Sequence, residues 1–590
     1  MEAGVKARPL LLILGLVLAL RLPFLNQAVQ GDDPVYLAEA SHALIEPLHA
    51  DHTEYVFRGR TVDLRGLTHP PLDGWMLAGL LAIFGGVKEI PFHAAYLSFS
   101  LIAAAAMWSL ARRFCANPVW ATLLFLAVPA FVVNGTSLET DVPFVAFWMA
   151  AIALFCADRL ALAALAMGLA SLTAYQTVVL IPILAVYCWL YRRRALAHWL
   201  TLLTPAVVFV AWQIFERVST GALPAGVLSG YFTIYQTLQA KLVNALALSI
   251  HFWFVIFPAL APFALLLAWR RRREPETQFL VAWIAIFFAS ALVIFFAGSA
   301  RYLLPMAAPM AMLAAGLPRR WLAIGFGLQM ALSLGLAAMN YQHWDAYRLY
   351  AASLGPVIEN HRVWVDDEWG LRHYMQEQGA LPLRTAQRLR AGDIIVSSQL
   401  SHAVEPTVLL APAAPTIEIR PAIPLRIIGI ESHSGYSSAA LDRLWPFGLS
   451  AGVIDRIHTV RVVEWHPALP YVDMKAPEAK DQIVSGIWPD DHWMSASGVV
   501  IVKSPPTAMP LGVNFYVPGN APARHISLLL DGQEVCATTL AAPGPGQLIC
   551  AAPLAPAGPT ALIEIRVDKT FRVPPDERDL GMVLLGVGFR

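Results

Sequence analysis

Charged side chains are scarce in this sequence. Of its 590 residues, 14% are Asp, Glu, Lys or Arg, whereas about 25% is usual in a soluble protein. The 42 basic and 41 acidic residues nearly cancel, so the chain has no basic surface with which to read DNA or RNA. Hydrophobic residues reach 57%, which excludes a disordered chain and an ordinary soluble enzyme.

The common signatures of nucleotide, zinc and hydrolase chemistry are missing too. The chain has no Gly-rich phosphate loop, no Cys/His spacing of the zinc type and no Gly-x-Ser-x-Gly turn. Nucleotide binding on a Rossmann-like domain is therefore disfavoured.

Cysteine is also rare, and the five cysteines fall into two groups. Three lie in or near apolar runs: Cys115, Cys156 and Cys188. The other two, Cys536 and Cys550, lie on strand-like runs joined by a Pro/Gly turn. In an exported hairpin they can close a disulfide. The alternative is that both are small buried apolar side chains.

Long apolar runs are abundant, and they crowd into residues 9–339. A helix that crosses a membrane needs about 20 apolar residues to span about 30 Å. The candidate runs are 9–25, 92–111, 118–134, 142–158, 160–173, 177–190, 197–215, 246–269, 278–297, 302–317 and 321–339. A shorter run, 72–86, is either a further span or a helix in the membrane interface.

Clusters of basic residues decide between these alternatives, because such clusters favour the cytoplasmic side. They are Lys6/Arg8, Arg112/Arg113, Arg192–Arg194, Arg270–Arg273 and Arg319/Arg320. If 72–86 lies in the interface, every cluster falls inside. We therefore predict eleven spans, a cytoplasmic N-terminus and an external C-terminus. The run 9–25 could be a secretory signal, but no small-residue cleavage site follows it, so we interpret it as a retained span.

Two adjacent carboxylates, Asp32 and Asp33, follow the first predicted span on the outer face. Ionisable groups at this depth are expensive to hold and are candidates for function. The alternative is a helix N-cap followed by proline in the first turn, which fits Asp33 better than Asp32. Asp32 is therefore the first candidate for chemistry.

Further polar side chains are predicted on the same face. His69 precedes two prolines that fix the start of the interfacial helix, and it is either functional or only a turn residue. Glu139 and Asp141 separate the third and fourth spans, where helix capping is the alternative role. Arg301 departs from the positive-inside trend, which favours anion binding over contact with lipid headgroups.

Each of these side chains belongs to a short motif. The motifs are Gly31-Asp32-Asp33-Pro34-Val35-Tyr36, His69-Pro70-Pro71-Leu72, Glu139-Thr140-Asp141-Val142-Pro143 and Arg301-Tyr302-Leu303-Leu304-Pro305. In this order they resemble the polytopic, lipid-dependent glycosyltransferases of the C-type fold, a superfamily that includes the protein O-mannosyltransferases and the lipid A aminoarabinose transferases. Asp33 stands where that family usually has Glu. The segment around Tyr175 is also similar, although Ala174 stands where Lys is common. The resemblance covers about residues 9–318.

The resemblance implies that a sugar moves from a polyprenyl-phosphate carrier to an acceptor, with inversion, at the periplasmic face of a bacterial inner membrane. It implies that Asp32 is the general base and that Arg301 binds the phosphate. The other substrate-binding residues that it implies are Asp33, Tyr36, His69, Glu139, Asp141, Tyr175 and Tyr302. In some members the second acidic pair holds a divalent cation, so Mg²⁺ or Mn²⁺ at Glu139 and Asp141 is an alternative. The acceptor stays open between protein, lipid and glycan.

Beyond the membrane part the sequence predicts two external domains. The full division is a transmembrane domain over 1–344, an α/β subdomain over 345–466 and an all-β, sandwich-like domain over 467–590. In the α/β subdomain, Val363–Val365 and Ile394–Val396 are typical of buried strands, with a helix between them. Asp366-Asp367-Glu368 is interpreted as a solvated strand end. Gly435-Tyr436 and Trp445–Gly448 are expected to form an ordered loop that reaches back to the membrane.

The last domain contains several short strand patterns separated by Pro/Gly turns, as in a sandwich. It resembles accessory domains of some bacterial glycosyltransferases, chiefly through Glu577–Gly581. Trp488, Trp493 and Tyr516 form either a surface for stacking sugars or part of the core.

Two other functions stay open from the sequence. A transporter or flippase would have charges in mid-span and an internal repeat of broken helices, neither of which is evident. A non-catalytic scaffold would bind glycan or protein through its external domains after losing activity.

Overall fold

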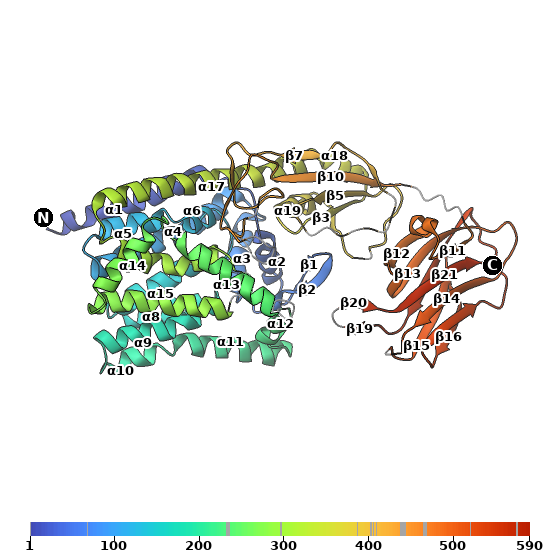
Figure 1. Ribbon diagram of the computed structural model, residues 1–590, viewed down its shortest axis with the longest axis horizontal. Coiled ribbons are helices and arrows are strands. Elements are labelled where there is room, and N and C mark those ends of the chain that lie inside the picture. The colour runs from blue at the N-terminus through green and yellow to red at the C-terminus, as the bar shows by residue number, and fades with distance from the viewer. Residues whose placement is uncertain are drawn as a thin grey trace.

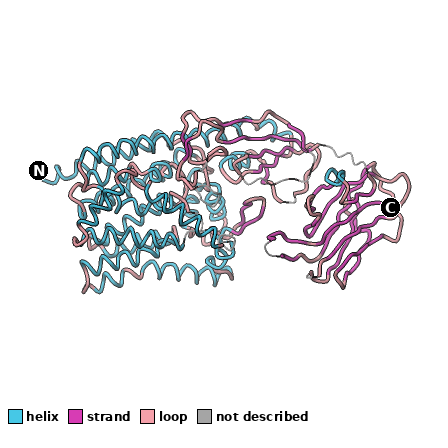
Figure 2. The backbone as a smooth tube through the Cα atoms, viewed as in Figure 1, coloured by secondary structure: helices cyan, strands magenta, loops and turns pink. Residues whose placement is uncertain are grey.

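The computed structural model describes residues 2–67, 69–231, 237–294, 298–385, 387–401, 404, 406, 408, 410–432, 434–436, 444–463, 469–519, 521–573 and 576–590. A bundle of helices forms the N-terminal half, an α/β domain lies beside its outer end, and a β-sandwich lies farthest from the bundle (Figures 1 and 2). Both external domains lie at the same end of the bundle, as the predicted topology requires.

The bundle is built from long helices and several short ones. These are α1 (Glu2–Arg21), η1 (Leu22–Phe24), α2 (Asp33–Ala43), η2 (Leu64–Gly66), α3 (Leu72–Phe84), α4 (Glu89–Phe114), α5 (Pro118–Leu126), α6 (Pro129–Asn134), α7 (Asp141–Cys156), α8 (Leu160–Ser171), η3 (Tyr175–Val179), α9 (Leu180–Tyr191), α10 (Leu196–Thr201), α11 (Thr204–Thr220), α12 (Pro224–Tyr231), α13 (Leu238–Trp253), α14 (Ala261–Arg270), α15 (Pro275–Ile294), η5 (Arg301–Met306), α16 (Ala307–Ala314) and α17 (Arg319–Ser353).

The predicted apolar runs all fold mainly as helix, but several are interrupted. Within the described residues, four helical segments are long and apolar enough to cross a membrane by themselves: α4, α10 with α11, α15 and α17. The run 118–134 breaks into α5 and α6 at Pro129, which cannot donate a helical hydrogen bond. The structure thus shows a helical region with four candidate spans among the described residues, while the count of eleven spans is not established. Likewise, the interfacial position of α3 stays a prediction.

A buried arginine binds the backbone carbonyls near the C-terminal end of α6. The Arg21 guanidinium donates to the carbonyl oxygens of Phe131 (2.6 Å) and Val132 (2.7 Å) and to the hydroxyl of Ser100 (3.1 Å). A Cβ atom at position 135 would overlap this guanidinium, so glycine is needed there. Arg21 therefore holds the end of α6 and the start of the loop that follows it, and this loop carries Glu139.

The α/β domain is connected to the bundle by α17, and the boundary predicted after residue 344 falls within this helix. Its elements are α18 (Gly355–Asn360), β3 (Val363–Asp366), α19 (Gly370–Glu377), β4 (Leu381–Pro382), β5 (Ile394–Ser398), β6 (Leu410–Pro412), β7 (Ile417–Ile419), β8 (Leu425–Arg426), β9 (Gly448–Leu449) and β10 (Asp455–Val462). The predicted strands β3 and β5 pair in parallel with α19 between them. The α/β prediction is therefore confirmed.

The interpretation of Asp366-Asp367-Glu368 as a solvated strand end is wrong. All three side chains are buried, because their oxygens accept backbone N–H groups that the fold brings to them. Asp367 accepts from Trp369 (3.0 Å), and Glu368 accepts from Arg58 (2.6 Å). Arg58 lies in the turn between β1 (Glu54–Phe57) and β2 (Arg60–Asp63), a hairpin in the first outer loop. These acids therefore join the external domain to that loop.

The last domain is rich in strands, as predicted. Its elements are β11 (Tyr471–Asp473), η7 (Pro477–Gln482), β12 (Ile483–Ile487), β13 (Trp493–Lys503), β14 (Leu511–Val517), β15 (Arg524–Leu530), β16 (Gln533–Leu540), β17 (Gly544–Ile549), β18 (Thr560–Val567), β19 (Phe571–Val573), β20 (Asp576–Leu580) and β21 (Met582–Phe589). The main strand order is β16-β15-β18-β13-β21-β14-β17. A disulfide between Cys536 and Cys550 joins the two edges of this sheet, so the bridge is present.

Candidate active site

Four of the predicted site residues meet around one guanidinium. Arg301 begins η5, and its Nη2 atom lies 3.1 Å from Oδ2 of Asp32. Its Nη1 atom forms ion pairs with Glu139 and with Oδ2 of Asp141, the latter at 3.3 Å. These residues come from three separate segments of the chain, so only the folded bundle brings them together.

A tight turn before α2 positions Asp32. Gly31 has a positive φ of 47°, and a Cβ atom there would overlap the Glu139 carboxylate. The backbone N–H of Asp32 donates to Oε1 of Glu139 at 3.1 Å. Glycine at position 31 is therefore required both by the backbone conformation and by the close approach of Glu139.

The neighbouring carboxylate of Asp33 is completely buried. Its two oxygens accept the backbone N–H groups of Leu138 (2.8 Å) and Gln30 (2.9 Å). Burial raises the pKa of Asp33 well above its usual range. Asp33 thus ties the turn before α2 to the loop before α7. The capping alternative does not describe it, because the N-cap of α2 is Asp32, whose side chain makes no capping hydrogen bond. The contact of Asp33 with substrate stays a prediction.

The three acids around Arg301 differ in how far solvent reaches them. The Asp32 side chain is 42% exposed, whereas those of Glu139 and Asp141 are 8% and 13% exposed. An acceptor arriving from the outer face would therefore meet Asp32 before the other two.

Tyr36 and His69 lie side by side. Their ring centroids are 6.0 Å apart in an edge-to-face arrangement. Nδ1 of His69 lies 3.0 Å from the hydroxyl of Thr140 and 3.2 Å from the carbonyl oxygen of Thr173. Burial lowers the pKa of His69 to about 4, so the imidazole is neutral at ordinary pH. Through Thr140, His69 adjoins the loop that carries Glu139.

The last two predicted residues lie in different surroundings. The Tyr302 ring lies 5.7 Å from the Arg301 guanidinium. Tyr175, in contrast, stacks on Phe209 of α11 with centroids 5.6 Å apart, and its hydroxyl accepts from Gln213 at 3.2 Å. Tyr302 therefore belongs to the cluster around Arg301, whereas the recorded contacts of Tyr175 are with α11.

Two residues not selected from the sequence complete the cluster. Asn134, at the end of α6, donates to Oδ2 of Asp141 at 2.6 Å. The hydroxyl of Tyr436, in the α/β domain, donates to the side-chain oxygen of Asn134. The prediction that the loop around Gly435-Tyr436 reaches back to the membrane part is thus confirmed. For Asn134 the sequence carries no signal, because one asparagine in an apolar run fits many roles.

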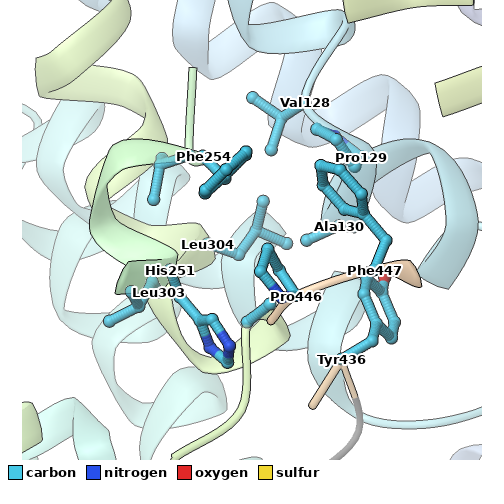
Figure 3. Close-up of a pocket in the computed structure, with 12 residues that line it drawn as sticks. Val128, Pro129, Ala130, His251, Phe254, Leu303, Leu304, Tyr436, Pro446 and Phe447 are labelled. Atoms are coloured by element: carbon cyan, nitrogen blue, oxygen red, sulfur yellow. The ribbon is translucent and has the colours of Figure 1, made fainter. Parts of the chain in front are cut away.

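A small apolar pocket adjoins the cluster (Figure 3). Its walls include Pro129 of α6, Phe254 after α13, Leu303 and Leu304 of η5, and Tyr436 and Phe447 of the α/β domain. Because Leu303 and Leu304 lie two and three residues after Arg301 in η5, the pocket and the guanidinium adjoin the same short helix.

The fit of a divalent cation can be tested on the side chains themselves. Within the described ranges, no group of three or more His, Cys, Asp or Glu residues is arranged to hold a metal ion. Glu139 and Asp141 both pair with Arg301 instead. The arrangement of Glu139 and Asp141 therefore does not fit a metal site.

Comparison with known proteins finds one family model that matches part of the chain. Residues 68–215 match the model of the family described as dolichyl-phosphate-mannose-protein mannosyltransferase. The matched segment contains His69, Glu139, Asp141 and Tyr175, so the resemblance to the protein O-mannosyltransferase superfamily is confirmed there. Among curated proteins, none matches the sequence.

Three solved structures are similar at low identity. ArnT from Cupriavidus metallidurans bound to undecaprenyl phosphate is 15% identical, with a TM-score of 0.45 over 67% of this chain and 93% of that one. The apo form of that protein is 14% identical, with a TM-score of 0.46 over 68% and 93%. The arabinofuranosyltransferase AftD from Mycobacteria is 11% identical, with a TM-score of 0.35 over 99% and 61%.

Proposed function

We propose that this protein is an integral membrane glycosyltransferase. It moves a sugar from a polyprenyl-phosphate carrier to an acceptor hydroxyl, with inversion, at the periplasmic face of a bacterial inner membrane. The observation that carries the proposal is the accessible carboxylate of Asp32 paired with the buried guanidinium of Arg301 at 3.1 Å. The family match over residues 68–215 supports the same class of reaction.

Asp32 acts as the general base in this proposal. The acceptor oxygen attacks the anomeric carbon and loses its proton to the Asp32 carboxylate, a transfer that general bases typically accelerate by about 10²–10⁴-fold. The bond between the anomeric carbon and the phosphate oxygen breaks, and its electron pair leaves with the polyprenyl phosphate. Because that phosphate is a good leaving group, no general acid is required.

Arg301 stabilises the departing phosphate. Its two terminal nitrogens face carboxylates, but within the described structure its buried Nε atom has no hydrogen-bond partner. A buried N–H group without a hydrogen-bond partner raises the free energy of the folded protein until an acceptor binds to it. A phosphate oxygen is such an acceptor, and charge-assisted bonds to guanidinium are among the strongest hydrogen bonds in proteins.

The surrounding residues position the two substrates. Glu139 and Asp141 hold Arg301 in place and offer oxygens to sugar hydroxyls. The small pocket beside Leu303 and Leu304 is apolar, so it offers the carrier an apolar contact next to Arg301. Tyr36 and His69 face the same loop and help to bind the sugar, and Asp33, Tyr175 and Tyr302 complete the proposed substrate-binding set.

A transfer assay on the purified full-length chain tests the proposal. Wild type and Asp32→Asn would be supplied with a panel of polyprenyl-phosphate sugars and with protein, lipid and glycan acceptors. We expect wild type alone to release polyprenyl phosphate. Equal release by Asp32→Asn would refute its role as base. Transport of the carrier without cleavage would favour a flippase, and glycan or protein binding without turnover would favour a scaffold.

Two further experiments test whether a divalent cation is needed and on which side of the membrane the site lies. An EDTA arm tests the alternative of Mg²⁺ or Mn²⁺ at Glu139 and Asp141, and unchanged turnover would count against it. Single cysteines placed in the first outer loop and in the loop after α14 would be labelled with an impermeant thiol reagent in whole cells. Labelling only in the first outer loop is expected for a periplasmic site.

A further inference from the structure

A line of side chains crosses four neighbouring strands of the β-sandwich. Trp493 on β13 is directly opposite Val583 on β21. Val583 is opposite Tyr516 on β14, and Tyr516 is opposite Pro545 on β17. Directly opposed residues of a ladder point to the same face of the sheet. These four residues, which we call the aromatic row, extend about 14 Å, since neighbouring strands lie about 4.8 Å apart.

The aromatic row is on the outer face of the sandwich. The residues next to it in sequence, Met494, Met582 and Phe515, are buried in the core, so the alternate positions must face outward. Tyr516 is 42% exposed, and Pro545 is exposed as well. The α/β domain contacts the sandwich at Glu564 of β18, which pairs with Arg388 outside the four strands of the row. The exposure of Tyr516 answers the choice between stacking surface and core in favour of the surface for that residue.

Polar side chains run beside the aromatic row on the same face. Asn514 lies two residues from Tyr516 and is opposite Gln547 of β17. The Asn514 side-chain oxygen, with the amide turned to satisfy its neighbours, accepts from the hydroxyl of Tyr471 at 3.2 Å and from the Arg590 guanidinium. The Tyr471 side chain extends over β21 toward Asn514 because residue 586 of β21 is glycine. A Cβ atom at position 586 would overlap the Tyr471 hydroxyl. The face thus offers ring surfaces next to amide and hydroxyl groups.

Charged groups at the end of the row are paired with one another. The Trp493 ring packs edge to face on Phe571, with centroids 5.9 Å apart. The Arg578 guanidinium lies over Trp488 at 4.7 Å and forms ion pairs with Asp491 (2.5 Å) and Asp576 (2.7 Å). Because these charges neutralise each other locally, they favour an uncharged ligand over an anion or a cation.

The position of the sandwich argues against a lipid surface as the partner. The sandwich is the part of the molecule farthest from the helical bundle, while the hairpin of β19 and β20 points back toward it (Figure 1). Aromatic side chains that anchor a protein in the membrane interface would have to lie at the level of the lipid headgroups. The sandwich that carries the aromatic row lies away from the bundle, although Trp493 at one end of the row contacts Phe571 of β19.

We propose that the outer face of the sandwich binds an uncharged glycan chain. The C–H faces of sugar rings stack on aromatic side chains such as Trp493 and Tyr516, and sugar hydroxyls exchange hydrogen bonds with the amides of Asn514 and Gln547. Small ligands are commonly held by such a combination of ring surfaces and a few placed polar groups. This site is separate from the cluster around Arg301, so glycan binding does not depend on the proposed transfer reaction.

The experiment measures glycan binding by the full-length protein in nanodiscs. Neutral mannan, glucan, galactan and arabinan would be immobilised, and retention would be compared for wild type, Trp493→Ala, Tyr516→Ala and Tyr516→Phe. We expect wild type to bind at least one glycan, each alanine variant to bind it at least tenfold more weakly, and Tyr516→Phe to bind nearly as well, because it keeps the ring. Leu562→Ala, which removes another exposed apolar side chain of the same sandwich, is the matched control.

Several outcomes would overturn the proposal. They are the absence of binding to all four glycans, equal binding by the alanine variants, equal loss in Leu562→Ala, and retention on vesicles of neutral lipid in place of glycan. The Asp32→Asn variant separates this proposal from the transfer reaction. Glycan binding that survives in Asp32→Asn supports the site on the sandwich whatever that variant does to turnover.

Discussion

Asp32 and Asp33 are neighbours in the chain, yet their surroundings give them different properties. Asp32 reaches solvent and pairs with Arg301. Asp33 is buried, and backbone N–H groups engage both of its oxygens. The turn at Gly31 and the first turn of α2 aim the two side chains in different directions. Substitution at the two positions should therefore have separable effects.

We expect Asp32→Asn to reduce transfer by about 10²–10⁴-fold, the usual contribution of a general base, with little change in thermal stability. Asp33→Ala should instead lower stability, since each buried N–H left without a partner costs about 1–3 kcal/mol. Turnover per folded molecule and thermal unfolding in detergent would be measured for both variants. A stable, inactive Asp33→Ala would contradict the structural role of Asp33.

His69 gives a prediction about pH. Its pKa is about 4 in the folded protein because it is buried, against an ordinary value of 6.5. Between these values the unfolded chain binds the proton and the folded chain does not, so His69 lowers stability as the pH falls from 6.5 toward 4 and has no such effect above 6.5. His69→Gln should therefore lose less thermal stability than wild type between pH 7 and pH 5. Parallel losses in the two proteins would show that His69 is protonated when folded.

At the scale of elements, the site depends on segments that are remote in sequence. The short helix α6 ends at Asn134, which holds Asp141, and Arg21 of α1 stabilises the carbonyls at that end. Tyr436 of the α/β domain then contacts Asn134. The external domain is thereby connected to the cluster around Arg301 through two side chains.

Tyr436→Phe tests this connection. The substitution keeps the ring in the apolar cavity but removes the hydroxyl, so Asn134 is free to rotate and Asp141 loses a fixed partner. A displacement of about 1 Å at a reacting group can cost up to about 10²-fold in rate, and we expect a smaller loss of kcat with KM for the acceptor unchanged. The rate would be measured with saturating donor. Phe447→Leu, in the same cavity wall, is the control and should leave kcat nearly unchanged.

At the scale of the whole molecule, the two external domains differ in how they are stabilised. The α/β domain is anchored to the bundle by α17 and by contacts with the hairpin of β1 and β2. The sandwich has its own core and a disulfide that closes its outer edges. We therefore expect the sandwich to lose stability independently when that bridge is removed.

The disulfide joins residues separated by 14 positions. Closing a loop of about 15 residues stabilises a domain by about 3 kcal/mol, so Cys536→Ser with Cys550→Ser should make the sandwich unfold and become sensitive to protease at a lower temperature. The bundle should keep its unfolding temperature. Limited proteolysis with mass spectrometry would distinguish the two parts. A sandwich that resists protease equally without the bridge would contradict this expectation.

The sequence by itself determined the class of the molecule and the main members of the site. Long apolar runs can be buried only in a membrane or a helical core, and ionisable groups at their ends are too expensive to keep without a role. For that reason Asp32, Glu139, Asp141 and Arg301 could be selected before any contact was known. The strands of the external domains were likewise predictable, because buried strands and turns leave local patterns.

Only the tertiary structure decided which of these groups touch and which are buried. Local patterns ranked Asp32 above Asp33 as a candidate, but they did not show that Asp33 is buried. They also do not distinguish the solvated from the buried form of Asp366-Asp367-Glu368, because burial depends on segments that are remote in sequence. The roles of Asn134 and Tyr436 could be recognised only in the structure, because their contacts with the cluster join segments that are remote in sequence. The alignment of Trp493 with Tyr516 also depends on the tertiary structure. Pairing between strands sets the register, and the register determines which face of the sheet each side chain occupies.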